Sequence, residues 1–360
     1  MLFNSLTPYG IELPKSDQLE EPRIMALVWR EKIADRCQHL QFQPLLPLQA
    51  QGEGFEPPFK DFNREYVVAA QNNQLLLICY RRDERKISAA GIKEKVAEKV
   101  ERIEQTEERK VRKSERESIA DELRQKSLPH ISPTPKRVLI LIDLLHSRIL
   151  IGSNSDTLVS HVRTLVRDHI LPRYSMPAEK FSEDDTGFEY VAPRLLVETY
   201  CQGDARIHYE QWMRRGVQGL HLHDLACLEK EGAKSIVVTG QALDAPVITD
   251  ALDDGYLPYQ VGISVLNNDE DNVIADLTLD RFGVYSKVKV PDYRAIVKSH
   301  HEDEAEAAMA DLQATMILTA GTVHDVNRAI TVAFGDDLAA GQAVQVSEEL
   351  AAAIVEAATA

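Results

Sequence analysis

The chain has 360 residues, of which 44% are hydrophobic and 27% charged, and its formal net charge is −16. This length is enough for two or three hydrophobic cores, because domains commonly contain about 100 to 200 residues. The composition is ordinary for a globular protein and indicates neither a fibrous repeat nor wholesale disorder. The strongest apolar runs, at 75–79 and 138–142, are too short to span a bilayer, so we expect no membrane partner. The four cysteines form no Cys-x-x-Cys pair, which argues against a zinc knuckle and favours a reducing, cytoplasmic compartment.

The positive charge is concentrated in one segment. Residues 81–137 contain seventeen Lys or Arg against twelve Asp or Glu, a net charge of +5, whereas the remainder carries −21. Proteins that bind a polyanion normally present such a basic footprint. The overall acidity therefore does not exclude a nucleic-acid partner.

The N-terminal part is predicted to combine strands with one early helix. Apolar residues at helical spacing predict the helix over 21–40, and strands are expected at 65–70 and 74–80. Asn72 and Asn73, between these two strands, predict a tight hairpin turn.

A long charged helical segment follows. Residues 92–128 contain neither Gly nor Pro and are rich in residues that favour helices. Apolar residues recur at spacings of three or four over 92–103 and more sparsely over 111–123. The stretch between them is almost wholly polar, so we expect one or two helices that project into solvent or bend there. A single continuous helix would reach roughly 50 Å at about 1.5 Å per residue.

The core is predicted to resume after this helical arm, which ends at a group of prolines. A buried strand pair is expected at 138–143 and 148–152, followed by an amphipathic helix at 156–169. The polar, acidic stretch 177–187 is predicted to be a linker between two domains.

The second unit is predicted to have α+β patterning. Strands are expected at 194–200, 235–239, 259–266, 272–279 and 284–290, and helices at 245–252, 305–311 and 323–334. In the Ala-rich tail, Ser347 is a plausible N-cap for one short final helix.

The usual catalytic signatures are absent from the sequence, including GxGxxG, the Walker loop, HExxH and GxSxG. His221 and His223 would lie on one face of a strand and could form part of a metal site with Asp224. Because no further ligand is identified, we favour a structural role for these residues. We therefore expect no catalytic residue, no metal and no cofactor.

A divalent-metal nuclease, the first alternative, would need several converging carboxylates. The densest acidic clusters, at 253–254 and 269–271, lie in hydrophilic, turn-like sequence, where a solvated loop is the favoured interpretation. The second alternative is an acidic protein-binding scaffold without DNA binding.

The arm offers a more specific feature. Arg109, Lys110, Arg112, Lys113 and Arg116 crowd five cations into about two helical turns, where they repel one another unless they are solvated, paired or in contact with an anion. Four neighbouring glutamates can pair with them locally, so composition alone leaves open whether this is a solvated helix or an anion-binding surface.

Several short segments occur in an order that is typical of one bacterial protein family. They are GFEPP at 54–58, QLLLIC at 74–79 leading to RRDERKI at 81–87, RKVRKSERES at 109–118, DEL at 121–123, LP at 128–129, ID at 142–143, Trp212, QG at 218–219, QAL at 241–243 and TAG at 319–321. By their order and spacing, the chain resembles the recombination-associated protein RdgC family from about Leu2 to Phe334, most closely over 74–143.

The resemblance implies an α+β fold, a horseshoe-shaped monomer with a projecting helical arm, and a homodimer that closes into a ring around DNA. On this basis we divide the chain into a centre domain in two parts (1–85 and 137–180), a helical tip (86–136), an α+β base domain (190–335) and a tail (336–360). The implied function is binding of double-stranded DNA with little sequence preference, with single-stranded DNA bound more weakly. The implied role is restraint of a RecA-type recombinase in the cytoplasm, at the nucleoid.

The same resemblance assigns residues to the two interfaces. The expected DNA contacts are Arg81, Arg82, Lys86, Arg109, Lys110, Arg112, Lys113, Arg116 and Gln241. Such contacts to phosphates position a protein on DNA but do not read its bases. The expected contacts between two tips are His130, Ile131 and Ser132, where the family has a basic residue and a nearby aromatic. In the base, Thr239 and Gly240 replace lysines of the family, so only Gln241 carries over.

Overall fold

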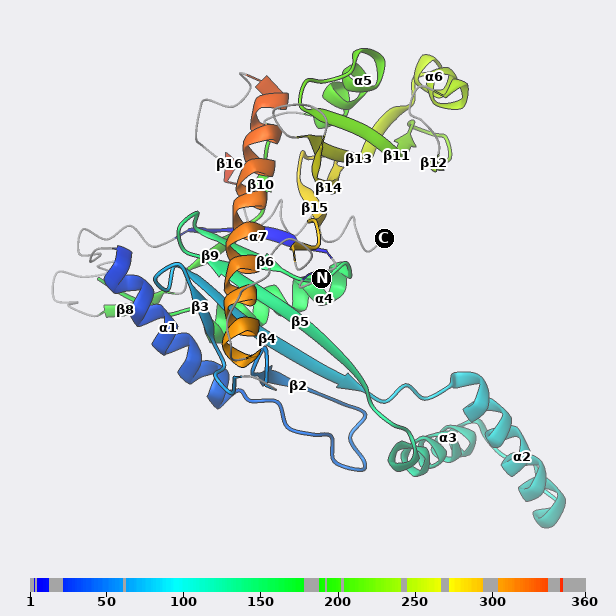
Figure 1. Cartoon of the computed structure of the whole chain (residues 1–360). Helices are drawn as coiled ribbons and strands as arrows, with labels where there is room; N and C mark the ends of the chain where they lie inside the picture. Colours follow the sequence, from blue (N-terminus) through cyan, green and yellow to red (C-terminus); the bar gives the residue numbers. More distant parts are fainter. Residues whose placement is uncertain are drawn as a thin grey trace, which may run out of the picture.

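The computed structural model describes residues 3, 5–12, 22–60, 63–177, 188–191, 193–201, 204–240, 245–266, 272–293, 304–335 and 344–345. Over these residues the protein is a mixed α/β structure built on two curled antiparallel sheets and a projecting helical hairpin (Figure 1). No helix in the described ranges is both long and apolar enough to cross a membrane.

The first sheet has seven strands. They are β1 (Thr7–Glu12), β2 (Gln51–Glu56), β3 (Val68–Ala70), β4 (Leu75–Glu84), β5 (Thr134–Asp143), β6 (Arg148–Ile151) and β9 (Arg194–Leu196). Their order is β2-β4-β5-β6-β1-β9, with β3 also paired to β4. The two long strands β4 and β5 pair along their whole length, from Leu75↔Asp143 to Glu84↔Thr134, and both lead to the arm (Figure 1).

The expected strand at 74–80 is confirmed, and its continuous apolar sequence has a structural reason. Side chains alternate between the two faces of a strand, and both faces of β4 are covered. Leu75 and Leu77 pack in the core that includes α7 (Glu304–Phe334), whereas Leu76 and Ile78 pack in the core that includes α1 (Pro22–His39) and α4 (Asp156–Leu165). A strand buried on both faces has few positions for polar residues.

The second sheet has five strands. In spatial order they are β12 (Ile236–Thr239), β11 (Leu220–Glu229), β13 (Leu257–Leu266), β14 (Val273–Asp280) and β15 (Tyr285–Lys289). Two helices, α5 (Ala205–Arg215) and α6 (Pro246–Asp253), contribute apolar side chains to cores formed with this sheet. The bridge Leu6↔Val288 and the long helix α7 connect the two sheets, because α7 contacts β3, β4 and β14.

Two short strand pairs complete the described part. β7 (Tyr174–Pro177) pairs with β8 (Phe188–Val191), and β10 (Glu198–Thr199) pairs with β16 (Val344–Gln345). The expected linker lies mostly outside the described residues, as does the expected helix after Ser347.

Several expected elements differ from the observed ones. The helices expected at 305–311 and 323–334 form one continuous helix, α7. The residues between the two expected helices include Met316, Thr319 and Ala320, whose burial stabilises the helix there. The strand expected at 194–200 is divided into β9 and β10. β9 pairs with β1, so it belongs to the first sheet and not to the second unit.

The arm is a hairpin of two helices, α2 (Ala89–Glu107) and α3 (Lys113–Ser127), followed by a 3-10 turn at Leu128–His130. The expected bend between the apolar stripes is confirmed, and the continuous 50 Å helix is wrong. Glu108 ends α2 in the left-handed conformation, with φ 53°, which turns the chain back. In Figure 1 the arm and the five-stranded sheet both extend to the right of α7, at opposite ends of the molecule.

Candidate nucleic-acid interface

A small hydrophobic core holds the two helices of the arm together. Val100, Val111 and Ile119 are buried in it, and flanking apolar side chains of both helices pack around them. The Glu104 carboxylate accepts a hydrogen bond of 3.0 Å from the backbone N–H of Val111. These contacts fix the connection 108–112 at the distal end of the hairpin.

Arg109 and Arg116, in and beside this connection, are paired with carboxylates of the arm. The Arg109 guanidinium donates to both oxygens of Glu115, at 2.7 and 2.6 Å, and to Glu107 at 2.6 Å. These acceptors raise the pKa of Arg109, and Arg109 in turn lowers the pKa of Glu115. Arg116 reaches Glu104 at 3.4 Å. Such exposed ion pairs contribute little to stability because solvent screens them, so an incoming anion can replace them.

Lys110, Arg112 and Lys113 are in a different situation at the same end of the hairpin. All three are exposed, and none of their side chains forms an ion pair or hydrogen bond with another described residue. Their charges are therefore available to an anion without the loss of an internal partner.

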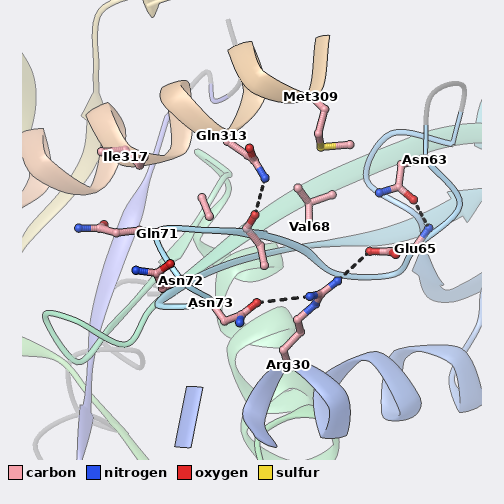
Figure 2. Close-up of a pocket in the computed structure, with 12 residues that line it drawn as sticks. Arg30, Asn63, Glu65, Val68, Gln71, Asn72, Asn73, Met309, Gln313 and Ile317 are labelled. Carbon is pink, nitrogen blue, oxygen red and sulfur yellow. Dashed lines mark hydrogen bonds and ion pairs between the residues drawn. The ribbon is translucent and has the colours of Figure 1, made fainter. Parts of the chain in front are cut away.

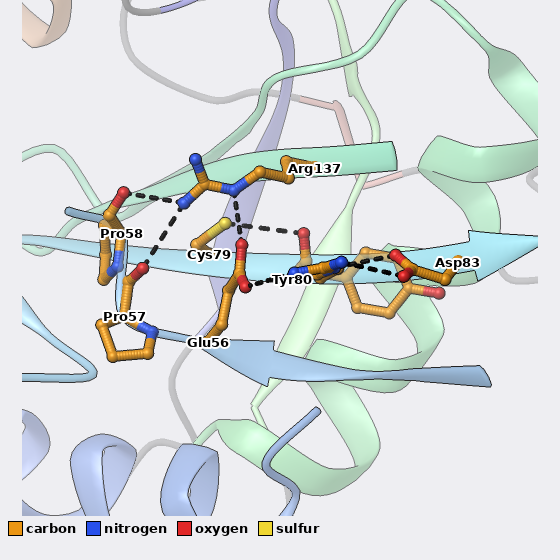
Figure 3. A network of polar contacts seen from close by, with 8 residues as sticks. Glu56, Pro57, Pro58, Cys79, Tyr80, Asp83 and Arg137 are labelled. Atoms are coloured by element: carbon orange, nitrogen blue, oxygen red, sulfur yellow. Dashed lines mark hydrogen bonds and ion pairs between the residues drawn. The ribbon is translucent and has the colours of Figure 1, made fainter. Parts of the chain in front are cut away.

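Arg81, in β4, is instead part of a polar network inside the protein. Figure 3 shows other members of this network, Glu56, Asp83 and Arg137. It donates to Asp83 at 2.7 and 2.8 Å and to Glu56 at 3.1 Å, and these hydrogen bonds raise its pKa. Both carboxylates are buried, with 3% of Asp83 and 8% of Glu56 exposed. Arg137 forms a second ion pair with Glu56 at 2.5 Å and donates to the carbonyl of Pro58 at 2.9 Å. The charge of Arg81 is thus compensated within the network.

Arg82 and Lys86 complete the expected basic residues at the root of the arm. Arg82 pairs with Glu84 at 2.8 Å and donates to Gln51 at 3.1 Å. Lys86 is exposed at the start of the linker into α2 and forms no ion pair with a described carboxylate. Of these two, Lys86 presents the more available charge.

The spacing of charged residues in β4 is a sequence signal for these internal pairs. Residues two apart in a strand point to the same face. In the segment RRDE at 81–84, this places Arg81 beside Asp83 and Arg82 beside Glu84. The partner strand β2 adds Glu56, which the sequence alone could not place there.

The expected tip contacts lie at the root of the hairpin and not at its distal end. His130 and Ile131 line a groove of about 480 Å³ between the start of α2 and the end of α3. The other lining residues are Ile87, Ser88, Gly91, Ile92, Lys95, Leu123, Lys126 and Ser127. The groove combines apolar side chains with two lysines and a histidine. Ser132 is exposed next to it.

A second cavity, of about 340 Å³, lies between α1, the turn from β3 to β4, and α7 (Figure 2). Its Arg30 side chain donates to Glu65 at 3.1 Å and to Asn73 at 3.4 Å, so its charge is compensated. Gln71, Asn72 and Asn73 form the expected turn, all with positive φ. The cavity is at the opposite end of β4 from the arm, about 30 Å away for a ten-residue strand, and contains none of the expected contacts.

The expected residues of the second unit are only partly described. Gln241, the acidic cluster 269–271 and the side chain of Asp224 lie outside the described part of the chain. His223 is 3.6 Å from Asp276, and Asp253 pairs with Arg214 at 2.9 Å. In the part of the chain that the structure describes, no group of three or more His, Cys, Asp or Glu is arranged to hold a metal ion.

Comparison with known proteins connects the arm and the first sheet to one family. Residues 18–185 match the family model described as "Putative exonuclease, RdgC". Over this segment, the chain is similar to the RdgC family. The matched RdgC segment includes the whole arm, β2 to β6 and the Arg81 network, and it ends before the second sheet.

Curated relatives agree with this assignment. The chain is 28% identical over 169 residues to the recombination-associated protein RdgC of Halorhodospira halophila, which covers 47% of this chain and 51% of that protein. It is 30% identical over 169 residues to the protein of the same name from Shewanella oneidensis, covering 46% and 51%. With the protein of that name from Yersinia pestis it shares 27% identity over 95 residues, covering 26% and 31%. The chain therefore spans about half the length of the first two of these relatives.

Proposed function

We propose that this RdgC-family chain binds double-stranded DNA without sequence preference and acts in recombination, where its occupation of DNA restrains a RecA-type recombinase. The role in recombination is inferred from the names of the relatives. The observation that carries the DNA-binding proposal is a set of three exposed cations at the distal end of a projecting hairpin, Lys110, Arg112 and Lys113, which have no ion-pair partner among the described residues. Single-stranded DNA would be bound more weakly, and the complex would belong to the nucleoid.

The charge distribution supports an approach of DNA through the arm. Residues outside 81–137 carry a net charge of −21, which repels a polyanion. Lys86 adds a further available cation near the root, and Arg109 and Arg116 can exchange a glutamate for a phosphate at low cost. Arg81 and Arg82 stay predicted contacts. To bind a phosphate, each would have to share or release the carboxylate with which it is paired within the protein.

We further propose that two copies associate through the groove at the root of the arm. The groove presents apolar side chains, including Ile92 and Leu123, that are suited to contact with a second copy. Sedimentation velocity of the wild type and of Ile131→Asp, which places a carboxylate in the groove, tests this association. A dimer that persists in the variant would contradict association through the groove. The proposed closure of two copies into a ring depends on this association.

Binding of a 30-base-pair duplex, measured by fluorescence anisotropy between 50 and 200 mM salt, tests the DNA contacts. With six to ten phosphate contacts, affinity should fall by about 10³- to 10⁵-fold across this range. The triple variant Lys110→Gln, Arg112→Gln, Lys113→Gln should reduce the slope of log affinity against log salt by about 3, because each lost phosphate contact removes about 0.9.

The matched control replaces two cations of the same hairpin that already have partners. Arg124 pairs with Asp121 at 2.6 Å and Lys99 with Glu122 at 2.6 Å, so Arg124→Gln with Lys99→Gln should change the slope less. A wild-type affinity that stays flat with salt, or equal slopes in the two variants, would contradict the proposal. The nuclease alternative is tested in the same samples with end-labelled duplex and Mg²⁺ or Mn²⁺, where we expect intact DNA.

A further inference from the structure

The arm is attached to the body by very few contacts. Two linkers connect it, an outgoing one at 85–88 and a returning one at 131–133. Among the described residues, no hydrogen bond or ion pair joins residues 89–130 to the body. The small core of the hairpin is also separate from the cores of the body. The direction of the arm must therefore be determined at the linkers.

Arg85 is the residue that joins the two linkers to the body. Its Nε donates to the carbonyl of Ile131, in the returning linker, at 2.9 Å. Its Nη1 donates to the carbonyls of Leu46, Pro47 and Gln49 at 2.6, 3.2 and 2.7 Å. Its own backbone N–H donates to Ala50 at 2.7 Å. One side chain thus holds three segments together.

The loop that accepts these hydrogen bonds is itself anchored to the first sheet. The backbone N–H of Phe42 donates to Phe55 of β2 at 2.7 Å, and that of Phe55 donates to Leu40 at 2.8 Å. Within the loop, the Gln49 side chain accepts from the backbone N–H of Leu46 at 2.9 Å. A bond from Arg85 to this loop is therefore a bond to the body.

The partners of Arg85 differ in kind from those of its basic neighbours. Arg81 and Arg82 pair with carboxylates, whereas Arg85 bonds only to backbone carbonyls and forms no ion pair with a described residue. Backbone carbonyls compensate the positive charge of Arg85 only partly, but the hydrogen bonds to them fix the guanidinium relative to the backbone of both segments. A planar guanidinium presents five N–H groups in a fixed fork, which a lysine ammonium cannot reproduce.

We propose that Arg85 is a positioning residue that sets the direction of the arm relative to the first sheet. It does so by holding the returning linker at Ile131 against the loop 46–49. Its effect on DNA binding rests on the proposed function. An arm held in one direction presents the distal cations without the entropic cost of ordering the arm on the DNA.

Distances between two nitroxide labels, measured by pulsed electron resonance on the full chain, test this proposal. Suitable label sites are Ala97→Cys on α2 and Lys32→Cys on α1, which are both exposed, and the four native cysteines are buried. The distance distribution should be narrow in the wild type and broader in Arg85→Ala. Arg85→Lys, which keeps the charge but loses the fork, should be broadened as well. The control Arg124→Ala changes an exposed residue whose side chain bonds to Asp121 within the arm, and it should leave the distribution narrow.

Unchanged distributions in both Arg85 variants would overturn the proposal. If Arg85→Ala does not fold, Arg85→Lys alone decides it, with the thermal midpoint as the check on folding. A residue that only stabilises the fold would lower that midpoint without broadening the distribution.

DNA affinity gives a separate readout. If the proposed function holds, Arg85→Lys should bind duplex on the order of 10-fold more weakly, with an unchanged salt slope because the number of phosphate contacts is the same. In Arg85→Ala, which removes the charge, a slope reduced by about 0.9 would identify Arg85 as a phosphate contact instead and overturn the positioning role. If the wild type does not bind DNA, the proposed function fails, while the label distances still decide the role of Arg85.

Discussion

Arg81 and Lys110 are both cations in the segment with excess positive charge, and they differ in what surrounds them. Arg81 lies against two buried carboxylates, Asp83 and Glu56, and Lys110 is exposed without a partner among the described residues. A charge that is already compensated attracts a phosphate only weakly, whereas removing Arg81 leaves the buried Asp83 carboxylate without this partner. A cation therefore serves stability at one position and is available to an anion at the other.

Arg81→Ala should consequently act on folding. We expect it to lower the free energy of unfolding by about 3 kcal/mol, because it removes one partner from a buried ion pair. Urea unfolding followed by circular dichroism measures this. Lys110→Ala, the control, should stay within about 0.5 kcal/mol of the wild type. Equal stability of the two variants would show that the Arg81 network is too hydrated to matter.

At the scale of elements, the sequence predicted best where local pattern and tertiary environment agree. The apolar run of β4, the helix α1 and the bend of the arm between its two apolar stripes all follow from periodicity or burial. The continuity of α7 and the place of β9 in the first sheet do not, because burial against distant strands determines them. For the site, the position of the basic cluster was predictable, but the division into paired and unpaired cations was not. That division depends in part on Glu56 and Glu104, which come within reach of Arg81 and Arg116 only after folding.

The hairpin offers a test of how independent an element the arm is. Its core is limited to Val100, Val111 and Ile119 with a few flanking side chains. Ile119→Ala should cost about 2 to 5 kcal/mol, the range for large-to-small changes at buried sites. Because so small a core supports little stability of its own, the hairpin should open while the body stays folded.

Amide hydrogen exchange measures this directly. In Ile119→Ala the amides of α2 and α3 should lose protection, while those of β4 and β5 keep it. Ser118→Ala, at the adjacent exposed position, is the control and should leave the hairpin protected. If protection falls equally in the arm and in the sheet, the two unfold as one cooperative unit.

At the scale of the whole molecule, the arm is an insertion into an otherwise continuous strand pair. β4 and β5 remain paired up to Glu84↔Thr134, immediately before and after the arm and its linkers. A two-residue turn such as Asn-Gly can join directly opposed residues of an antiparallel pair. The first sheet therefore does not need residues 85–133 to close, and the matched RdgC segment combines a folding unit with a separable helical hairpin.

Replacing residues 85–133 by Asn-Gly should leave a folded body without salt-dependent DNA binding. The body keeps both of its large cores, because none of the buried residues of those cores comes from the arm. Thermal unfolding should therefore remain cooperative. Duplex affinity, followed across the same salt range, should fall to background, because the cations at 109–116 and Lys86 are gone and the remaining chain is acidic. The triple variant Lys110→Gln, Arg112→Gln, Lys113→Gln keeps the arm but removes three of its exposed charges. Comparison with the armless protein therefore distinguishes the effect of these charges on affinity from the effect of the arm as a whole. If the armless protein still bound duplex with the wild-type salt slope, the contacts would lie on the body, and the arm would serve only association between copies.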